Sequence, residues 1–339
     1  PLPGRFERTL ANLREVPPSY HFNVPAGYAM LVAEFERDPA FAQHMLSHLD
    51  YAYYAGAGLP ADTHARWQRA AVRAIGREVP IGTAYAATET TAAVTMRTWA
   101  AADTACIGVP MPGSELKLVP DTAMPGRFEV RVRGPGVFER YLDAPDATAA
   151  AFDDEGWYRL GDAVRFVDPD KPVEGLLFAG RIAEDFKLGN GTWVRTGSLR
   201  TRLLAACAPL LREAVLVGEG RDAVGALAWV DPAACRAALG PEHAADDAAL
   251  ITDVRLRALL EQRLAAANEG QSASTFRVAS LILLAEPPSL DGYELTDKGS
   301  INARAVAERR AATVDELYAR PSSAQVIQPR APDLADAAS

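Results

Sequence analysis

Two short segments of the chain carry side chains of the kinds that bind nucleotides. In Thr83–Thr91, TAYAATETT, an aromatic ring (Tyr85), a hydroxyl (Thr88) and a carboxylate (Glu89) stand at the exit of an expected strand. The hydroxyl could contact a phosphate, and the carboxylate could hold Mg²⁺, which prefers carboxylate oxygens beside substrate phosphates. Taken alone, however, the segment is better explained as a polar helix cap.

The second segment, GWYRLGDAVRF, places Asp162 directly after a glycine at an expected turn. A carboxylate in this position could accept hydrogen bonds from two ribose hydroxyls, since an ionised carboxylate has two acceptor oxygens. An ordinary turn would also explain the segment. Neither segment therefore identifies a site by itself.

A glycine-rich stretch, YAGAGLPAD, contains the pattern Gly56-x-Gly58-x-x-Ala61 between an expected strand and an expected helix. This spacing formally matches the dinucleotide-binding fingerprint. The acidic residue expected at the end of the next strand is missing, because Glu78 precedes the strand 79–86 instead of following it. An NAD-dependent oxidoreductase thus stays a weak alternative to a turn that binds no ligand.

Other chemistries have less support. His44 and His48 would share one helix face, but the glutamate of an HExxH zinc site is absent between them. No G-x-S-x-G elbow of a serine hydrolase occurs. The three cysteines, Cys106, Cys207 and Cys235, are an odd number at wide spacings. They predict neither a disulfide framework nor a zinc site, and they fit a reducing cytoplasm.

Charge and hydropathy narrow the class of partner. A formal net charge of -9 argues against nucleic acid, because phosphate binding needs a surplus of Lys and Arg on one face. No apolar run approaches the ~18 to 20 residues that span a bilayer, and no signal peptide is recognised. We therefore expect a cytoplasmic protein that binds small molecules, without a nucleic-acid or membrane partner and with an unknown oligomeric state.

The elements that must position these side chains follow from the hydrophobic periodicity. Residues 1–104 alternate between helices (26–36, 38–49, 61–75) and short strands (51–54, 79–86), which indicates an α/β fold. Residues 105–181 alternate with a period of two and predict a small antiparallel sheet or barrel.

Beyond residue 181 the pattern predicts a smaller α+β unit. We expect a hairpin (186–195), strands at 212–218, 225–230 and 276–284, and helices at 198–207, 253–267 and 301–317. The composition of residues 321–339, rich in Pro, Ala, Ser and Asp, predicts a disordered tail.

Read in order, five segments resemble the later motifs of the adenylate-forming superfamily of acyl-CoA synthetases, adenylation domains and luciferases. They are YAGAGLP, YAATETT, GWYRLGD, GRIAEDFKL and LTDKGSINAR, and the resemblance runs from about Val16 to Ala319. FNVPAGY, RIAEDFKL, GTWV and LTDKGSINARAV are most similar to feruloyl-CoA synthase, a ligase for hydroxycinnamic acids. The implied fold is the C-terminal portion of the acyl-CoA synthetase-like fold: part of a large α/β domain with a small β-barrel subdomain, then a mobile α+β domain at 182–320.

The resemblance implies an acid-thiol ligase that uses ATP, Mg²⁺ and coenzyme A to convert a carboxylic acid into an acyl-adenylate and then a thioester. It assigns adenine or acyl contacts to Gly56, Ala57, Gly58 and Tyr85, the α-phosphate to Thr88, Mg²⁺ to Glu89, and the ribose to Asp162 and Arg181. The acyl pocket would be lined by small and aromatic residues: Phe22, Asn23, Pro25, Tyr54, Gly82 and Thr83. Residues 182–184 would form the hinge, with Lys298 serving adenylation and Lys187 thioester formation.

Three departures from the family pattern matter. Leu160 stands where the family usually has Thr, and Lys298 lies three residues before Ile301 instead of directly before it. The Gly-rich phosphate loop that ends in Pro-Lys does not occur in the printed sequence. We therefore expect a portion of a longer ligase that is inactive alone. The alternative is a non-catalytic remnant that binds a nucleotide or a partner.

Overall fold

The computed structural model describes residues 5–91, 93–101, 103–122, 124–240, 246–295 and 301–330. The chain divides into two compact units, Pro1–Ala179 and Gly180–Ser339, here called the N-terminal and the C-terminal unit. Among the helices of the described residues, none is both long enough and apolar enough to cross a membrane.

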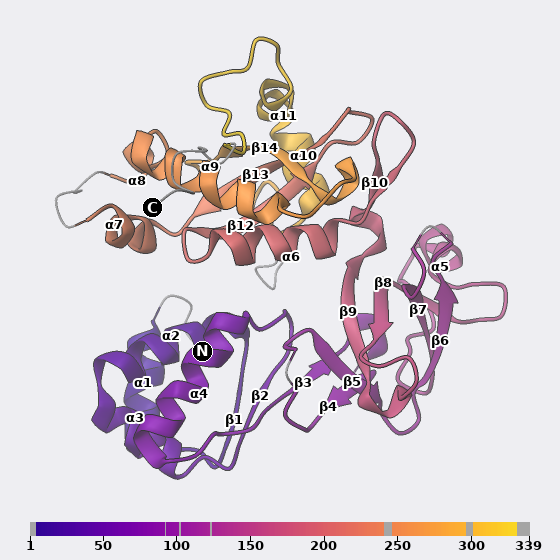
Figure 1. Ribbon diagram of the computed structural model, residues 1–339. Coiled ribbons are helices and arrows are strands. Elements are labelled where there is room, and N and C mark those ends of the chain that lie inside the picture. Colours follow the sequence, from indigo (N-terminus) through magenta and orange to yellow (C-terminus); the bar gives the residue numbers. More distant parts are fainter. Residues whose placement is uncertain are drawn as a thin grey trace. The chain divides into compact units, whose positions relative to one another are not determined.

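The N-terminal unit is built on one nine-stranded sheet in the order β1-β2-β3-β4-β5-β9-β8-β7-β6 (Figure 1). Its first three strands are parallel, β4 pairs antiparallel with β3, and β5 pairs antiparallel with β4. The strands are β1 Tyr20–Asn23, β2 Tyr51–Tyr54, β3 Ile81–Tyr85, β4 Thr95–Arg97, β5 Cys106–Pro110, β6 Glu115–Pro120, β7 Phe128–Arg133, β8 Tyr158–Phe166 and β9 Leu176–Arg181.

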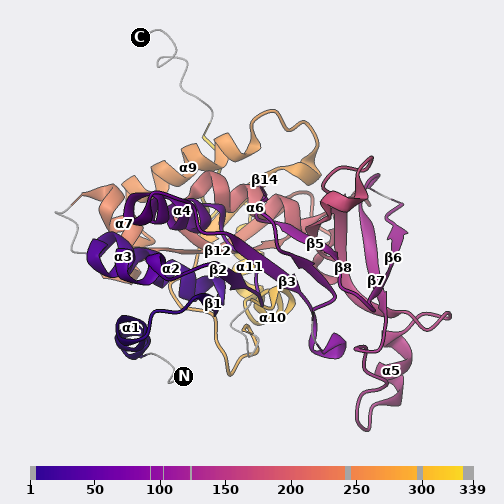
Figure 2. The same cartoon turned by 90° about the horizontal axis from the view of Figure 1, so that it is seen from below.

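Helices cover one face of the parallel strands, as both cartoon views show (Figures 1 and 2). They are α2 Pro25–Arg37, α3 Pro39–Ser47 and α4 Ala61–Ile75; α1, Phe6–Glu15, packs against α3, and a short α5, Pro145–Ala151, precedes β8. Buried side chains of α2, α3 and α4, such as Leu31, Met45 and Trp67, form one apolar core with those of β2 and β3. The expected helices and strands of residues 20–85 are therefore confirmed, with shifts of one or two residues at their ends.

Of the two alternatives expected at 105–181, an antiparallel sheet or a barrel, the structure shows the sheet, and the strands of the described residues do not close into a barrel. The start of β5 pairs with β9 (Cys106 with Leu177), and its end pairs with β4 (Thr95 with Pro110). One strand thus joins both halves into an open sheet. Gly108, at the change of partner, has φ +83°, and an added Cβ would lie 2.0 Å from the carbonyl oxygen of Met96. Only glycine allows this approach of two backbones.

The C-terminal unit contains a two-stranded hairpin and a three-stranded sheet in the order β12-β13-β14. β13 is buried along its whole length, because α6 and α9 pack on one face of the sheet and α10 and α11 on the other. The elements are β10 Phe186–Lys187, β11 Trp193–Val194, α6 Thr196–Cys207, β12 Leu211–Val217, β13 Val224–Val230, α7 Pro232–Leu239, α8 Asp247–Leu250, α9 Val254–Asn268, β14 Val278–Leu283, α10 Ala303–Arg309 and α11 Ala311–Leu317.

Two expectations for this unit differ from the structure. The single helix expected at 301–317 is broken at Arg310 (φ -101°, ψ 29°), whose guanidinium pairs with the buried carboxylate of Glu294. Residues 321–339 were expected to be disordered, but Val326 and Ile327 are buried in the core of this unit. Ile327 exchanges two backbone hydrogen bonds with Leu281 of β14. Residues 331–339 lie outside the described part of the chain.

Candidate nucleotide site

Two predicted site residues, 77 positions apart in the sequence, are in direct contact. The hydroxyl of Tyr85, the last residue of β3, donates a hydrogen bond of 2.6 Å to Oδ2 of Asp162 on β8. Asp162 is 8% exposed, and the half-buried ring of Tyr85 packs against Phe178 of β9 at a centroid distance of 6.2 Å. The predicted adenine-contacting ring and the predicted ribose-binding carboxylate therefore lie side by side.

An irregularity in β8 places the Asp162 carboxylate. Between the pairs Arg131–Arg159 and Glu129–Ala163, three residues of β8 stand against one residue of β7, so the chain of β8 bulges there. Gly161 lies in this bulge at φ +76°, a conformation that L side chains rarely adopt. Bulges of this kind re-aim single side chains beside functional sites. The bulge thus explains why glycine precedes Asp162 in the sequence.

Glu89 lies in a single 3-10 turn, η1 (Thr88–Thr90), directly after β3. Its half-buried carboxylate accepts a hydrogen bond of 2.8 Å from the Tyr141 hydroxyl, and its carbonyl oxygen accepts one of 2.7 Å from the Phe138 amide. Thr91 adds a third link, because its hydroxyl donates to the carbonyl oxygen of Gly136 at 2.7 Å. The turn is therefore fixed against residues 136–141. The Thr88 side chain is exposed.

The sequence reasoning missed the tyrosines beside Glu89. The Tyr141 ring packs at a tilt against Phe138 (centroids 4.7 Å apart), and Phe138 in turn packs edge-on against Tyr158 of β8. Burial raises the pKa of Tyr158 well above its ordinary value, and the charge of Glu89 raises it further. Burial raises the pKa of Tyr141 as well, and its hydrogen bond to Glu89 adds to that shift. The available signal was the density of aromatic residues between positions 138 and 158.

The glycine-rich loop Gly56-Ala57-Gly58 connects β2 to α4 and is exposed. Gly56 has φ +89°, so its position in the turn favours glycine, whereas a Cβ added at Gly58 would meet nothing within 4 Å. The second glycine of the dinucleotide fingerprint therefore has no steric role in the chain itself.

The residues predicted for the acyl pocket do not share one surface. Tyr54 and Thr83 point to the helix-covered face, where the Thr83 hydroxyl donates to the carbonyl oxygen of Tyr54 and the Tyr54 hydroxyl donates to that of Thr104. Phe22, 64% exposed, lies on the opposite face, since side chains alternate along a strand.

Gly82 belongs to the same open face as Phe22. The Tyr51 ring lies over it, so that an added Cβ would lie 2.1 Å from the Tyr51 hydroxyl. The rings of Tyr20, Phe22, Tyr51 and Tyr53 pack against one another in tilted pairs along this face of β1 and β2. Asn23 is at the end of β1, where its side-chain oxygen accepts a hydrogen bond from the Val24 amide, and Pro25 begins α2.

Two family descriptions match the chain. The family description "AMP-binding enzyme" matches residues 2–142, and "AMP-binding enzyme C-terminal domain" matches residues 186–322. The chain belongs to the AMP-binding enzyme family.

Relatives and solved structures agree with this family. A long-chain-fatty-acid–CoA ligase of Mycobacterium bovis is 29% identical over 252 residues, which are 72% of this chain and 39% of that ligase. 4-Coumarate–CoA ligase 2 of Oryza sativa is 35% identical over 125 residues, 35% of this chain and 20% of that enzyme. This chain thus spans less than half the length of these curated relatives.

The fold is shared with solved adenylation domains. The A domain of a carboxylic acid reductase from Segniliparus rugosus, in complex with AMP and a co-purified carboxylic acid, aligns with a TM-score of 0.67 at 20% identity, over 94% of this chain and 49% of that one. An anthranilate CoA ligase in complex with anthranoyl-AMP aligns with a TM-score of 0.63 at 23% identity, over 91% of this chain and 52% of that one. At these identities the likeness shows the fold alone.

A divalent cation would fit at Glu89 only together with a substrate. Among the described residues, no three His, Cys, Asp or Glu side chains are grouped so that they could hold a metal ion. Glu89 would therefore hold Mg²⁺ together with phosphate oxygens of a nucleotide. The carboxylate suits this role, because within the described ranges it accepts from a neutral tyrosine and has no Lys or Arg partner.

The predicted hinge is a second 3-10 turn, η3 (Ile182–Glu184), directly after β9. Exposed Arg181 precedes it, and the fully buried carboxylate of Asp185 follows it, where it accepts from the Thr196 amide at 3.0 Å and contacts Arg195 at 3.3 Å. Lys187 is exposed, and its ammonium lies 5.1 Å from the Trp193 ring centroid. Lys298 lies outside the described residues.

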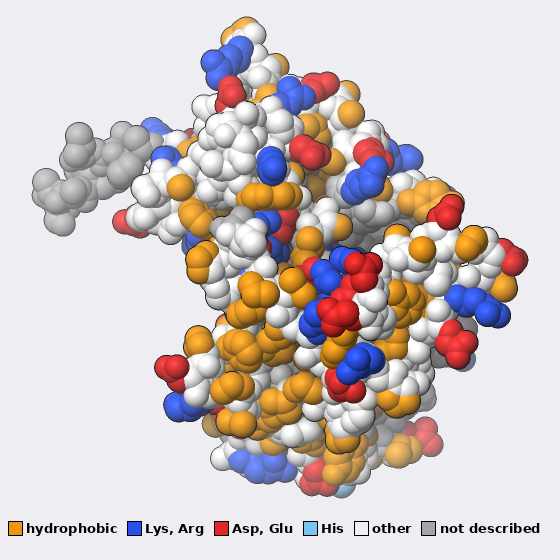
Figure 3. Space-filling model, turned by 90° about the vertical axis from the view of Figure 1, so that its right-hand side faces the viewer, with side chains coloured by type: hydrophobic (Ala, Val, Ile, Leu, Met, Phe, Trp, Pro, Cys, Tyr) orange, Lys and Arg blue, Asp and Glu red, His pale blue; other side chains and the backbone are white. Residues whose placement is uncertain are grey.

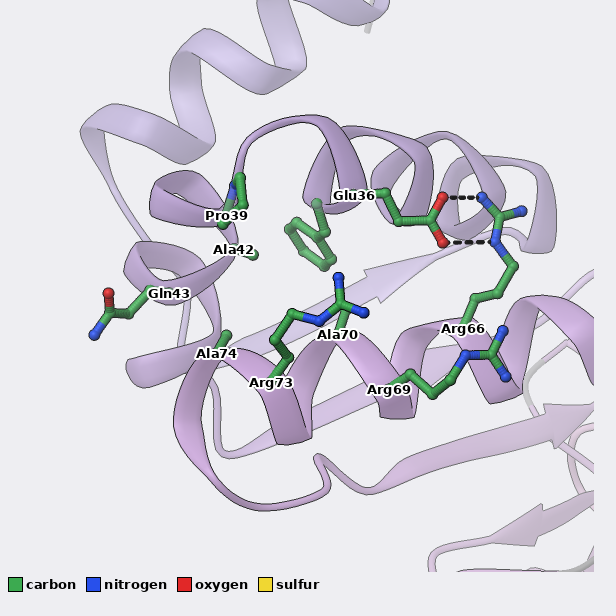
Figure 4. A pocket seen from close by; sticks show the side chains of 10 residues that line it. Glu36, Pro39, Ala42, Gln43, Arg66, Arg69, Ala70, Arg73 and Ala74 are labelled. Atoms are coloured by element: carbon green, nitrogen blue, oxygen red, sulfur yellow. Dashed lines mark hydrogen bonds and ion pairs between the residues drawn. The ribbon is translucent and has the colours of Figure 1, made fainter.

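A hollow of about 160 Å³ lies elsewhere, between α2, α3 and α4 (Figure 4). Glu36 and Arg66 pair across its rim through two hydrogen bonds, and Arg69 and Arg73 complete its basic side. None of the predicted site residues lines it, so it does not belong to the nucleotide site.

Proposed function

We propose that this chain supplies the adenine, ribose and metal side of the active site of an ATP-dependent acid-thiol ligase. The main support for this proposal is the hydrogen bond between Tyr85 and Asp162. The fixed turn that holds Glu89 directly after the strand of Tyr85 adds to it. An aromatic ring, a ribose-accepting carboxylate and an unneutralised carboxylate are the groups that a nucleotide with a bound cation requires.

The remaining assignments follow the family pattern. Thr88, exposed beside Glu89, would contact the α-phosphate, and the Gly56–Gly58 loop would lie along the adenine and the acyl group. Arg181 would contact the ribose. Lys298 would stabilise the negative charge that develops during adenylation, and Lys187 would act in the transfer to coenzyme A.

We propose a planar hydroxycinnamate-type acid as the acyl substrate. The neighbouring aromatic rings of Phe22, Tyr51 and Tyr53, beside Gly82, support an aromatic partner. Figure 3 shows hydrophobic side chains at the surface among Lys, Arg, Asp and Glu side chains. The similarity to a 4-coumarate–CoA ligase agrees, whereas the similarity to a fatty-acid ligase favours an aliphatic acid.

The test of the nucleotide site is calorimetric titration of the chain with AMP. We expect binding by the unchanged chain, and about 10- to 100-fold weaker binding by Asp162→Asn, because hydrogen bonds to a charged acceptor contribute about 1.5–3 kcal/mol. Tyr20→Phe, which alters an exposed ring on β1, serves as the control. Equal AMP affinity of Asp162→Asn and the unchanged chain would reject the ribose role, and tight NADH binding without AMP binding would favour an oxidoreductase.

The acyl preference is tested with non-hydrolysable acyl-adenylate analogues. The feruloyl analogue should bind more tightly than the decanoyl analogue if the substrate is a planar aromatic acid. The reverse order would assign the chain to a ligase for aliphatic acids and leave the nucleotide site intact.

A further inference from the structure

We propose that Tyr141 is a positioning residue for the metal-binding carboxylate of Glu89. The inference rests on the proposed function, because it concerns the divalent cation that would bind there with a nucleotide. It adds to that function a residue from a different part of the sequence, 52 positions beyond Glu89.

The first support is the way in which Glu89 is held. Its side chain and its backbone both bond to residues 138–141: the Tyr141 hydroxyl donates to Oε1 at 2.8 Å, and the Phe138 amide donates to the carbonyl oxygen at 2.7 Å. Two contacts from one short segment fix both the turn and the direction of the carboxylate. Groups that orient a metal ligand in this way commonly change metal affinity 10- to 100-fold when they are lost.

The second support is the chemical nature of the donor. A lysine or arginine in this place would cancel the charge of Glu89 and repel a cation. A tyrosine hydroxyl, in contrast, occupies one acceptor position and leaves the negative charge in place.

The third support is the packing of Tyr141 itself. Its ring lies 4.7 Å from that of Phe138, which also stacks on Phe152 and meets Tyr158 edge-on. The Tyr141 amide donates to the hydroxyl of Thr148, in the middle of α5, at 3.0 Å. Because side chain and backbone are both restrained, little entropy is lost when the carboxylate binds its cation.

The test uses Mn²⁺ as the probe cation and AMP as the nucleotide. The affinity of the chain for AMP is measured in EDTA and again in Mn²⁺, and the ratio reports the cation at Glu89. In Tyr141→Phe we expect this ratio to fall about tenfold towards unity, while AMP binding in EDTA and the melting temperature stay unchanged. Tyr20→Phe should leave all three quantities unchanged, and Glu89→Gln should abolish the dependence on Mn²⁺.

The possible outcomes separate the inference from the function on which it rests. If Glu89→Gln abolishes the effect of Mn²⁺ but Tyr141→Phe matches the unchanged chain, the positioning role is wrong and the proposed function stands. If Glu89→Gln retains the full effect, the metal role of Glu89 is wrong, and the role of Tyr141 falls with it. Failure of the unchanged chain to bind AMP would overturn both.

Discussion

Glu89 in the N-terminal unit and Glu294 in the C-terminal unit carry the same carboxylate in opposite settings. Glu89 is half-buried and accepts from a neutral tyrosine, with no Lys or Arg partner among the described residues. Glu294 has a fully buried side chain, is bound by both Nε and Nη2 of Arg310, and accepts from the Ser289 amide at 2.7 Å. The first setting preserves a charge for a ligand, and the second cancels the charge within the fold.

A candidate metal ligand and a structural carboxylate differ here in the charge of their hydrogen-bond partner. Burial alone would favour Glu294, which is the more enclosed of the two. The partner decides instead, because an ion pair already satisfies the buried carboxylate, whereas a hydroxyl leaves the net charge to be balanced by something else. Mutations of the two glutamates should therefore act on different quantities.

The largest expected effect is on stability. Glu294→Ala leaves the Arg310 guanidinium without its buried partner and should destabilise the C-terminal unit by about 3–5 kcal/mol, the usual cost of breaking a buried pair. Urea denaturation followed by tryptophan fluorescence measures this, because the Trp229 ring centroid lies 5.4 Å from the Arg310 guanidinium. A loss below about 1 kcal/mol, the scale of an exposed pair, would mean that the pair does not support the fold.

The second effect is a dependence on pH. The Arg310 hydrogen bonds lower the pKa of Glu294 below its ordinary value of 4.5, despite the opposing effect of burial. The folded state therefore binds this proton less readily than the unfolded state. The contribution of the Glu294–Arg310 pair to the free energy of unfolding is therefore fully present above the ordinary pKa of Glu294. It is lost as the pH falls through the lowered pKa of the folded state.

Urea midpoints measured between about pH 3 and pH 7 would show this acid loss, since protonation of Glu294 then opposes folding. In Glu294→Gln this part of the dependence should disappear, because the amide does not titrate. An unchanged acid limb in that variant would assign the loss to other carboxylates.

Glu89→Gln should change the stability of the N-terminal unit by about 1 kcal/mol or less, since one hydrogen bond to a hydroxyl is at stake and an amide oxygen can still accept it. Thermal unfolding of the variant checks this. Destabilisation as large as that of Glu294→Ala would place Glu89 among the structural carboxylates and remove the contrast.

The smallest effect is expected for an exposed pair. Arg304 and Glu308 lie four residues apart on α10 with an Nε–Oε1 distance of 2.7 Å, and both side chains are exposed. Glu308→Ala should cost about 0.3–0.5 kcal/mol, as for other surface pairs on helices. A loss comparable to that at Glu294 would show that burial is not the cause of the difference.

Much of the local structure was predictable from the sequence. The periodicity predicts the bounds of β2 and α4 to the residue, and the order of the motifs predicts that Tyr85 and Asp162 belong to one site. Tyr141 was missed because its role depends on a contact with a residue far away in the sequence, which no local pattern encodes. The choice between a sheet and a barrel at 105–181 was not predictable for a related reason, since only pairing geometry reveals that β5 has two different partners.

The break in the last helix shows another limit. Residues 303–317 keep an apolar stripe, and their composition suits a continuous helix. Arg310 leaves the helical conformation where its side chain reaches Glu294, so that a tertiary ion pair accompanies the interruption. Such a pair is visible only once the fold is known.

Gly180 gives the start of the C-terminal unit a mechanical property. It has φ +92°, and a Cβ built on it would lie 2.8 Å from Cα of Gly197, in the first turn of α6. Because two backbones are in contact there without side chains between them, no change of side-chain rotamer can relieve a closer approach. A displacement of the start of α6 would therefore displace the end of β9 as well, and a methyl group at position 180 would force the two segments apart.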